Sequence, residues 1–538
     1  MSEEKIWTSE SLERIYNSIR STHGIRPNEI QEYILHQSVT RLTDEMKQKV
    51  KERQNDKIRR LELAGVQCYE QGRFHSALLY LFQAVWFGSK NAEIMNLIGE
   101  CYWDGKGIVK NAADAVEWYR KAADRGLAEA QKNLGYCYDM GIGVQQNHSE
   151  AFRWNQKAAL QGNMKAQHNI AYSYEKGEGT EKDLEKAVRW YHRAASQGFK
   201  DSQVNLGNCY KNGIGVKQNS EKAVIWYRKA AEQGSAGAQA ALGHCFRTGT
   251  GVEKDSREAA KWYHKAAEQG HTGSMVWLGS FYRTGDGVEL DDVEAARWYE
   301  KAAEKGNVTA QNILAYLYHT GVGVEKNLAK AAMWYQKAAE QGQASAQNVL
   351  GHMYWTGYGV TKNVRESVRW HRMAANQGYT DSEYWIGLCY DEGRVFEQSA
   401  AKAVLWYHKA AVKGHKEAQY QLAEHYNQGR GIVRDAVEAV KWYQKAAEQG
   451  HTAAQYQLAD CFFYGNGITS NYREAAAWYE KAAEKGMAEA QYQLGMLYKM
   501  GTGVKKDKMT AKEWLAKAAA QGYKAAQSEL EKSKRLFW

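Results

Sequence analysis

Hydrophobic and small residues recur along the chain in a pattern that repeats every 36 residues. The clearest copy is residues 418–450, AQYQLAEHYNQGRGIVRDAVEAVKWYQKAAEQG. Twelve tryptophans share this spacing with no insertion between them: Trp118, Trp154, Trp190, Trp226, Trp262, Trp298, Trp334, Trp370, Trp406, Trp442, Trp478 and Trp514. A period of about 20 to 50 residues is typical of solenoids and other repeat arrays. The sequence therefore predicts a chain of similar units.

The apolar positions within one unit predict two helices. The stripe of the first helix, in one copy, comprises Ala130, Leu134, Cys137 and Tyr138. The stripe of the second helix, in another copy, comprises Ala439, Trp442, Tyr443 and Ala446. Both sets follow the helical spacing of three or four residues, so each lies on one face of a helix. Small residues beside the large ones, such as the Ala122–Ala123 pair, allow the two helices to approach closely.

Start and stop signals agree with these stripes. Glycine follows the first helix in all twelve units, from Gly105 to Gly501, and ends the second helix from Gly126 to Gly522. Glycine accepts the left-handed backbone that a helix end requires. Asn, Asp or Ser precedes the second helix in every unit, as at Asn147, and such side chains cap free amides. Six units add a glutamate that predicts a capping box, at Glu150, Glu258, Glu294, Glu366, Glu438 and Glu474.

The combined pattern, A-Q-x-x-L-G-x-x-Y-x-x-G-x-G-V followed by K-A-x-x-W-Y-x-K-A-A-x-Q-G, resembles the Sel-1-like repeat (SLR), a relative of the tetratricopeptide repeat (TPR). The resemblance covers about residues 89–538. It implies an all-α fold, a right-handed superhelical α-solenoid of antiparallel helix pairs. It also implies an adaptor or scaffold for protein complexes, and it implies no chemistry.

The regular repeat divides the chain into three parts. Residues 1–60 are expected to form an N-terminal helical extension, and residues 61–88 a degenerate, TPR-like capping repeat with Tyr80 in the tryptophan place. Residues 89–538 are expected to form the repeat solenoid, with about twelve repeats and a polar C-terminal half-repeat as its cap helix. Three units depart from the pattern, at Asn155, at His371 and at Val395, and we interpret each as drift.

Composition changes this picture little. The net charge of +10 is spread along the chain, and the single proline, Pro27, is consistent with nearly continuous helix. Six of the seven cysteines occupy one repeat position: Cys101, Cys137, Cys209, Cys245, Cys389 and Cys461. We interpret them as small core residues in a reducing compartment. With no apolar run in residues 1–20 and no stretch of about 20 apolar residues, a cytoplasmic location is expected.

Motifs for chemistry are absent from the sequence. The Gly-x-Gly turns follow helices rather than strands, and none leads into Gly-Lys-Ser or Gly-Lys-Thr. No His-Glu-x-x-His or Cys-x-x-Cys occurs. We therefore expect no enzyme activity, no cofactor and no metal, although sequence alone leaves open a catalytic site assembled across repeats.

Candidate partner-binding residues lie on the first helices, which line the concave face in the TPR geometry. One repeat position places a basic trio, Lys211, Arg247 and Arg283, before the aromatic residues Trp355 and Phe463. Another position ends in a series of tyrosines, Tyr384, Tyr420, Tyr456 and Tyr492. Arginine and aromatic side chains anchor many interfaces, so this groove suits an acidic, aromatic protein or peptide partner. The tyrosines also fit a simpler role, packing between first helices.

Nucleic acid is the alternative partner. Residues 47–60 contain seven basic and two acidic residues, and the C-terminal repeat is also basic. A basic N-terminal arm of this kind contacts nucleic acid or an acidic partner in one reading. In the other it is a solvated helix that leads into the solenoid, which the absence of interleaved aromatic residues favours. The final residues, Leu536, Phe537 and Trp538, either fold back on the last helix or form a docking tail.

Overall fold

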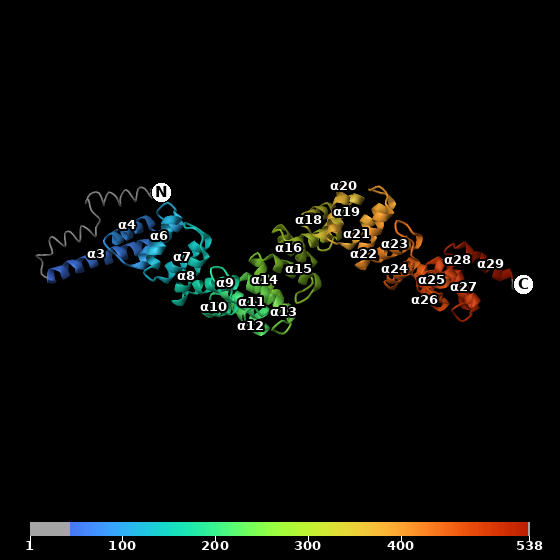
Figure 1. Ribbon diagram of the computed structural model, residues 1–538, viewed down its shortest axis with the longest axis horizontal. Helices are drawn as coiled ribbons and strands as arrows, with labels where there is room; N and C mark the ends of the chain where they lie inside the picture. Colours follow the sequence, from blue (N-terminus) through green and yellow to red (C-terminus); the bar gives the residue numbers. More distant parts are fainter. Residues whose placement is uncertain (1–43, 536–538) are drawn as a thin grey trace. The chain divides into compact units, whose positions relative to one another are not determined.

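A computed structural model describes residues 44–535 of the chain. Within this range the backbone forms 27 helices, α3 to α29, and no strand (Figure 1). This confirms the predicted all-α solenoid of helix pairs. Residues 1–43 of the expected N-terminal helical extension and the tail at 536–538 lie outside the described residues.

The helices alternate between the two kinds expected from the sequence. The first helices of the twelve repeats are α5 (Ala92–Asp104), α7 (Ala128–Met140), α9 (Met164–Lys176), α11 (Lys200–Asn212), α13 (Ala236–Thr248), α15 (Thr272–Thr284), α17 (Val308–Thr320), α19 (Ala344–Thr356), α21 (Thr380–Glu392), α23 (Lys416–Gln428), α25 (Thr452–Tyr464) and α27 (Ala488–Met500). The second helices are α6 (Ala112–Ala123), α8 (His148–Leu160), α10 (Leu184–Ser196), α12 (Ser220–Glu232), α14 (Ser256–Glu268), α16 (Asp292–Glu304), α18 (Leu328–Glu340), α20 (Val364–Asn376), α22 (Ala400–Val412), α24 (Ala436–Glu448), α26 (Tyr472–Glu484) and α28 (Lys508–Ala520). Before them lie α3 (Asp44–Glu70) and α4 (Phe74–Trp86), and after them α29 (Lys524–Arg535).

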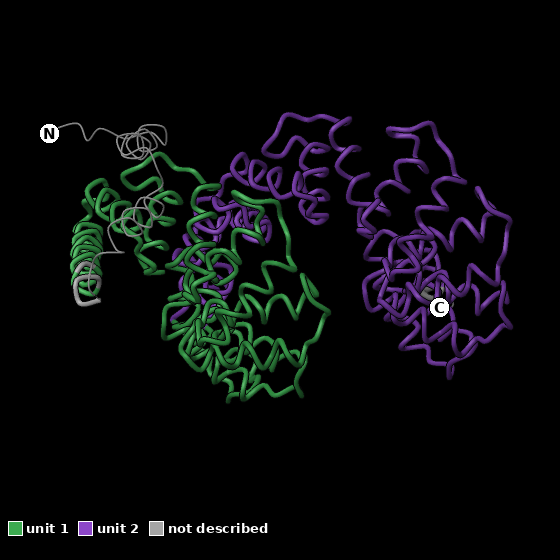
Figure 2. The backbone as a smooth tube through the Cα atoms, turned by 60° about the vertical axis from the view of Figure 1, so that its left-hand side comes forward, with its two compact units in different colours: residues 1–274, 286–288 green, residues 275–285, 289–538 purple. Residues whose placement is uncertain are grey.

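The chain divides into two compact units (Figure 2). Unit 1 comprises residues 1–274 and 286–288, and unit 2 comprises residues 275–285 and 289–538. Helix α3 runs through residue 60 without interruption, so no helix end marks the expected boundary between residues 60 and 61. The three-part division of the sequence therefore stays a prediction.

The predicted helix stops are confirmed. Gly141 follows α7 with φ of 68°, a left-handed conformation that side chains with a Cβ rarely adopt, and its amide donates to the carbonyl of Cys137. After α6, Gly126 donates to the carbonyl of Ala123 at 3.0 Å and Leu127 to that of Ala122 at 3.3 Å. These two bonds satisfy carbonyls that the helix leaves without a partner.

The caps of the second helices are confirmed, but the capping boxes are not. Asn147 accepts from the amide of Glu150 at 3.0 Å, as predicted. A capping box would also need the glutamate to accept from the amide of Asn147. That amide instead donates to the carbonyl of Tyr138 at 2.9 Å, and Glu150 pairs with Arg153 at 3.4 Å. The hydrogen bond to Tyr138 joins the turn to the preceding helix. The side chain of Glu150 is then available to pair with Arg153 on its own helix.

Most second helices carry a tyrosine that packs against a small residue of the first helix. A Cβ added to Gly207 would lie 2.6 Å from Cε1 of Tyr227, so the ring needs glycine beneath it. The tryptophan one position earlier carries a basic side chain on its ring, with Nζ of Lys445 4.0 Å from the centroid of Trp442. Both rings lie in the core that the sequence pattern predicts.

Backbone contacts join the turn of one repeat to the second helix of the repeat before. Gly143, the second glycine of its turn, has φ of 72°, and a Cβ there would lie 2.2 Å from the carbonyl oxygen of Ala112. The equivalent distance from Gly215 to the oxygen of Leu184 is 2.1 Å. Only glycine permits so close an approach, which explains why this turn position is so often glycine.

A row of glutamines forms a second link between repeats. Gln131 donates to the carbonyl of Ala123 in the preceding repeat at 3.1 Å, and its Oε1 accepts from Gln161 of its own repeat at 2.8 Å. The same pair recurs from Gln197 to Gln167 and from Gln449 to Gln419, each at 2.7 Å. These buried amides leave few polar atoms unsatisfied at the junctions.

The first helix pair departs from one expectation. Ala77, Leu81 and Ala84 of α4 are buried as predicted, but Tyr80 is 36% exposed and does not take the tryptophan place in the core. Two positions later, Phe82 packs on Trp118 of the next repeat, with ring centroids 5.7 Å apart, as the equivalent His192 packs on Trp226. The spacing of a core stripe therefore does not by itself bury the ring of Tyr80.

Candidate partner-binding surface

The first helices present one face away from the second helices, and we call this the first-helix surface. In α7, Leu134 and Tyr138 point into the core, whereas Tyr136 and Met140 are exposed. Asp139 is partly buried beside them. The predicted contact positions are those equivalent to Lys132, which includes the tyrosine series, to Tyr136, and to Asp139, which includes the basic trio. In α7 all three reach the surface at least in part.

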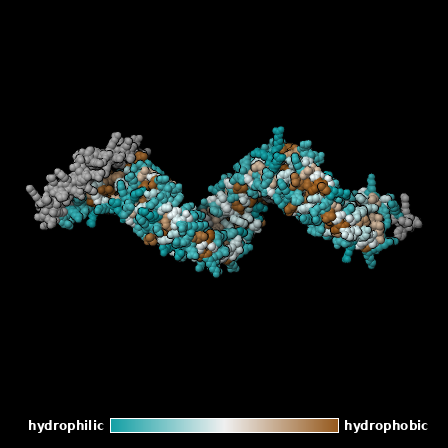
Figure 3. Space-filling view, viewed as in Figure 1, coloured by the Kyte–Doolittle hydropathy of each residue, from teal (hydrophilic) through white to brown (hydrophobic). Residues whose placement is uncertain are grey.

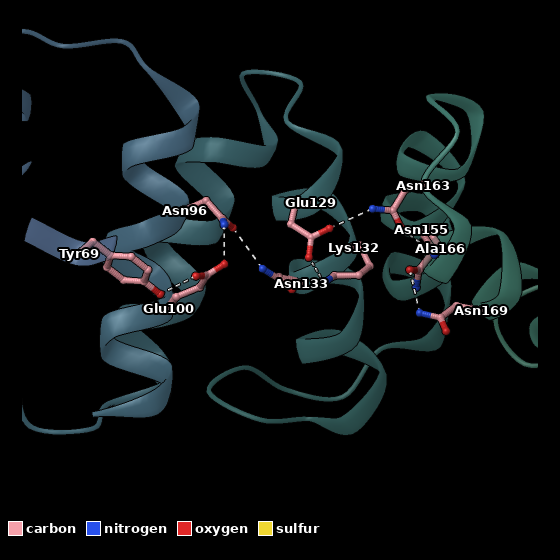
Figure 4. Close-up of polar contacts among 10 residues, drawn as sticks. All are labelled: Tyr69, Asn96, Glu100, Glu129, Lys132, Asn133, Asn155, Asn163, Ala166 and Asn169. Atoms are coloured by element: carbon pink, nitrogen blue, oxygen red, sulfur yellow. Dashed lines mark hydrogen bonds and ion pairs between the residues drawn. The ribbon is translucent and has the colours of Figure 1, made fainter. Parts of the chain in front are cut away.

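Polar side chains link the first helices of unit 1 (Figure 4). Tyr69 of α3 donates to Glu100 of α5 at 2.9 Å, and Asn96 donates to the same carboxylate at 2.8 Å. Asn133 of α7 donates to Asn96 at 3.1 Å. This part of the surface is thus occupied by contacts within the chain.

The tyrosines of the second helices extend their hydroxyls to the first-helix surface. Tyr191 donates to Glu175 at 2.8 Å, and Tyr227 donates to Asn208 at 2.7 Å. Burial raises the pKa of Tyr191 well above its usual range, and the charge of Glu175 adds to the effect. The hydroxyls therefore stay protonated and hold their acceptors in place.

Two of the three predicted basic residues, Lys211 and Arg247, lie in unit 1 on α11 and α13. Arg247 donates to Nδ1 of His244 at 3.2 Å and hydrogen-bonds the hydroxyl of Tyr263. Burial lowers the pKa of His244, and the charges of Lys211 and Arg247 lower it further. Among the described residues no carboxylate pairs with Lys211. The surface between α11 and α13 is therefore positive, with His244 held neutral.

The third predicted basic residue, Arg283, belongs to unit 2. Its guanidinium hydrogen-bonds Tyr299, whose pKa burial raises and Arg283 partly lowers. Arg283 thus repeats the contact that Arg247 makes with Tyr263. The sequence singled out Arg247 for its position but missed His244, one helical turn before it, although that three-residue spacing was a visible signal.

The aromatic candidates of unit 2 are partly buried. Trp355 packs on Trp385 with centroids 5.5 Å apart, and Phe463 lies 5.3 Å from Tyr472 and 4.9 Å from Tyr464. Tyr464 is the most exposed of these, at 62%. Figure 3 shows hydrophobic side chains in small separate groups on a mainly hydrophilic surface.

The four tyrosines pack between repeats. Tyr384 stacks on His415 and Tyr420 on His451, with centroids 4.7 and 4.5 Å apart. Each histidine caps the start of the next first helix. The ring of Tyr456 lies 5.7 Å from that of Tyr479, and the ring of Tyr492 lies 5.2 Å from that of Tyr523, between centroids. These contacts fit the simpler of the two roles that the sequence left open, packing between first helices. Part of each ring stays accessible, and its contact with a partner stays a prediction.

Across residues 44–535 no group of three or more His, Cys, Asp or Glu side chains is arranged to hold a metal ion. No helix in this range is long and apolar enough to cross a membrane. The seven cysteines are buried and unbridged, and burial raises the pKa of Cys101 and Cys137 to about 12. These thiols remain protonated, which suits core residues.

Comparison with known proteins identifies the repeat. The family model described as Sel1 repeat matches residues 92–127, 128–163, 165–199, 200–235, 236–271, 273–307, 308–343, 344–379, 380–415, 416–451, 452–487 and 488–523. A search of curated proteins finds no match.

Two solved structures have the same repeat. The protective antigen c5321 of uropathogenic Escherichia coli, which displays an SLR fold, is 35% identical, with a TM-score of 0.69 over 79% of this chain and 91% of that one. A Sel1 repeat protein from Oxalobacter formigenes is 33% identical over 57% of this chain and 89% of that one, with a TM-score of 0.48. Since the family model covers most of the chain, the protein belongs to the Sel1 repeat family.

Proposed function

We propose that the protein is a non-enzymatic scaffold that binds an acidic segment of a protein partner on the first-helix surface of unit 1. Sel1 repeat solenoids generally serve as scaffolds for protein–protein interaction. The proposal adds where the partner binds and that the bound segment is acidic. Both points rest on Lys211, His244 and Arg247.

The supporting observation is the electrostatic state of His244. Its pKa is lowered by burial and by the charges of Lys211 and Arg247, so the imidazole stays neutral while two cations flank it. A carboxylate placed between α11 and α13 would gain from both cations in a partly desolvated setting, where the attraction exceeds that in water.

Exposed tyrosines on the neighbouring first helices favour a partner with apolar or aromatic residues beside its acidic ones. Tyr136 and Tyr172 are 42% and 43% exposed. Trp103 packs edge-on against Tyr136, with centroids 5.9 Å apart. Aromatic side chains at a partly buried surface anchor partners at a low entropic cost. The proposed partner segment is therefore acidic and aromatic, as the sequence suggested.

Charge reversal tests the proposal. The Lys211→Glu, Arg247→Glu double variant should weaken binding of a fluorescently labelled, Glu- and Tyr-rich peptide by about tenfold or more, because two attractions become repulsions. Fluorescence anisotropy measures the affinity. The matched control is Arg153→Glu, Arg189→Glu, which makes the same change in net charge on exposed second-helix residues of unit 1.

Equal weakening in the control would replace the proposed site by a general charge effect. Because Arg247 also holds Tyr263, the milder Lys211→Glu, Arg247→Gln variant and circular dichroism separate lost binding from lost folding. A single-stranded oligonucleotide is measured in parallel. One outcome is that the oligonucleotide binds more tightly than the peptide, with the same affinity for the double variant as for the unaltered chain. That result would favour the alternative, nucleic-acid binding through the basic helix α3 and the C-terminal repeat.

A further inference from the structure

Three neighbouring first helices of unit 2, α21, α23 and α25, are strongly acidic. They contain seven carboxylates against one lysine, Lys416. The carboxylates are Asp381, Glu383, Asp391, Glu392, Glu417, Glu424 and Asp460. In unit 1, by contrast, α11 and α13 contain three lysine or arginine residues and one acidic residue. The first-helix surface of α21, α23 and α25, which we call the acidic surface, therefore attracts cations rather than anions.

Pairs within the chain neutralise three of the seven carboxylates. These pairs join Glu383 to Lys413 at 2.7 Å, Asp391 to Arg430 at 3.5 Å and Glu392 to Arg394. Among the described residues, no lysine or arginine pairs with Asp381, Glu424 or Asp460. The hydroxyls of Tyr443 and Tyr479 donate to Glu424 and Asp460 without adding positive charge. Negative charge therefore remains on this surface for a cation from another molecule.

His415 lies between two of the carboxylates and does not neutralise them. Its Nδ1 accepts from the amide of Ala418 at 3.1 Å, so this nitrogen carries no proton and cannot donate to Glu417, 3.5 Å away. The ring is then neutral, with its proton on Nε2, which lies 3.5 Å from Asp381. Lys416 lies 3.7 Å from Glu417 in an exposed and therefore weak pair. The side chains of Asp381 and Glu417 are 56% and 41% exposed, so both charges are accessible.

A tyrosine ring lies beside these charges. Tyr384 stacks on His415, with ring centroids 4.7 Å apart, and part of its ring stays accessible. Burial raises the pKa of Tyr384, and the charges of Glu417 and Glu392 raise it further, so both carboxylates act on the ring. Lysine and arginine gain from carboxylates and from aromatic rings alike. A tyrosine flanked by carboxylates therefore suits the side chain of lysine or arginine.

A buried hydroxyl beneath the acidic surface lacks a hydrogen-bond partner. In the next repeat, Tyr443 extends its hydroxyl to Glu424, but the residue of α21 equivalent to Glu424 is Leu388, which has no acceptor. The hydroxyl of Tyr407, the equivalent of Tyr443, accordingly has no partner among the described residues, although the side chain is fully buried. Burial raises the pKa of Tyr407, and the charge of Asp391 adds to the effect, so the hydroxyl stays protonated. Its oxygen can accept from an N–H group of a partner, which removes the cost of an unpaired buried hydroxyl.

We infer that the acidic surface of unit 2 binds a lysine- or arginine-rich segment of a second protein. The cationic side chains of this segment pair with Asp381 and Glu417 beside the ring of Tyr384, and one N–H group donates to the hydroxyl of Tyr407. Glu424 continues the contact along α23. The site is independent of the basic surface proposed for unit 1, and a chain with both sites holds an acidic and a basic partner at once.

Fluorescence anisotropy with a labelled Lys- and Arg-rich peptide tests the inference. The Asp381→Asn, Glu417→Gln variant should weaken binding by about tenfold, because two charge pairs are lost. The matched control is Glu366→Gln, Glu474→Gln, which removes two carboxylates from the first turns of second helices of unit 2 and should bind as the unaltered chain does. Asp381 and Glu417 also lie in first turns, so both variants lose the same net charge and the same favourable interaction with the helix dipole. Circular dichroism checks that both variants remain helical.

The Tyr407→Phe variant tests the hydroxyl. It should weaken binding by about fivefold through one lost hydrogen bond. The free chain makes no hydrogen bond with this hydroxyl, so its stability in urea denaturation should not fall. Unchanged affinity would overturn the contact assigned to Tyr407.

Three results would overturn the inference as a whole. The first is equal weakening in the site variant and the control, and the second is an affinity no higher than that for a Gly- and Ser-rich peptide of the same length. The third is self-association of the unaltered chain, in analytical ultracentrifugation, that the Asp381→Asn, Glu417→Gln variant abolishes, which would assign the surface to a second copy. The Lys211→Glu, Arg247→Glu variant should bind the basic peptide at least as tightly as the unaltered chain does. This inference and the proposal for unit 1 therefore fail separately.

Discussion

The same slot of the repeat is filled in two ways within unit 2. In α24, Tyr443 is fully buried and donates its hydroxyl to Glu424 on the first-helix surface at 2.6 Å. In α20, His371 is equally buried, lies against Gly351 and stacks on Trp385 with centroids 4.0 Å apart. Its Nδ1 lies 3.3 Å from Ser382. The tyrosine therefore connects two layers of the solenoid, whereas the histidine makes its contacts inside the core.

This difference shows how one recurring shape can carry different chemistry. The small residue beneath the slot leaves room for a flat ring, and either ring fills it. Burial raises the pKa of Tyr443 above its usual range, so its hydroxyl remains a donor. Burial and the neighbouring His352 lower the pKa of His371 to about 2, so the imidazole stays neutral. The slot at His371 thus couples folding to acid pH, whereas at Tyr443 the coupling arises only in alkali, near and above the usual pKa of tyrosine.

Removal of the tyrosine ring should have the largest effect. The Tyr443→Ala variant loses a fully buried ring and leaves a cavity, so we expect a destabilisation of about 3–5 kcal/mol in its repeat. The loss should be local at first, since each repeat contacts only its neighbours. Hydrogen exchange of α23 and α24 measures it, with α19 and α20 of the same sample as the control. A uniform loss over all repeats would contradict this local picture.

Acid should act next most strongly, and on the other repeat. The unfolded chain binds a proton at residue 371 below about pH 6.5, whereas the folded chain keeps it neutral. The free energy of local unfolding around α20 should therefore fall as the pH falls below 6.5, by up to about 1.4 kcal/mol per pH unit. His371→Tyr should remove this contribution.

The measurement is hydrogen exchange of α19 to α21 between pH 7.5 and 5, corrected for the intrinsic pH dependence of exchange. The unaltered chain and the His371→Tyr variant are compared at each pH, so that other histidines cancel. His352 contacts His371 and titrates as well, and a His352→Gln variant separates the two. Parallel curves for the unaltered chain and the His371→Tyr variant would assign the pH dependence elsewhere.

Removal of the hydroxyl alone should have the smallest effect. Tyr443→Phe keeps the ring and loses only the bond to Glu424, which costs about 1 kcal/mol. The acceptor is partly exposed and keeps Gln428 as a donor, which limits the loss. Urea denaturation followed through exchange of α23 and α24 detects this. A change as large as that of Tyr443→Ala would mean that the hydroxyl, rather than the ring, holds the slot.

The local fold was predictable because the same pattern of helix stripes, caps and stops recurs in every unit. A chance glycine or asparagine carries little information, but glycine at Gly105 and at its eleven equivalents identifies a helix end in every unit. Two expectations failed for reasons that the pattern does not encode. Glu150 has the spacing of a capping box, yet the carbonyl of Tyr138 takes the amide that it needed. Tyr80 has the spacing of a core residue, yet it stays 36% exposed.

The sequence predicted the positions of the candidate site residues better than the contacts that their side chains make. Spacing alone placed Lys211 and Arg247 at the surface of neighbouring first helices. It did not reveal that Tyr384 and Tyr420 would stack on histidines 31 residues further along, because those histidines belong to the next repeat's helix start. Nor could spacing assign Lys211 and Arg283 to different compact units, which depends on packing along the whole array.

The contact at Gly143 also limits how such a protein can change over generations. The turn backbone of one repeat rests directly on the backbone of the repeat before, with no side chain between them to absorb an error. One added or lost residue would move every later turn out of its backbone contact with the repeat before. Gain or loss of a whole 36-residue copy recreates the same junction on both sides. The array can therefore lengthen or shorten by gene-segment duplication and deletion while its joints stay unaltered.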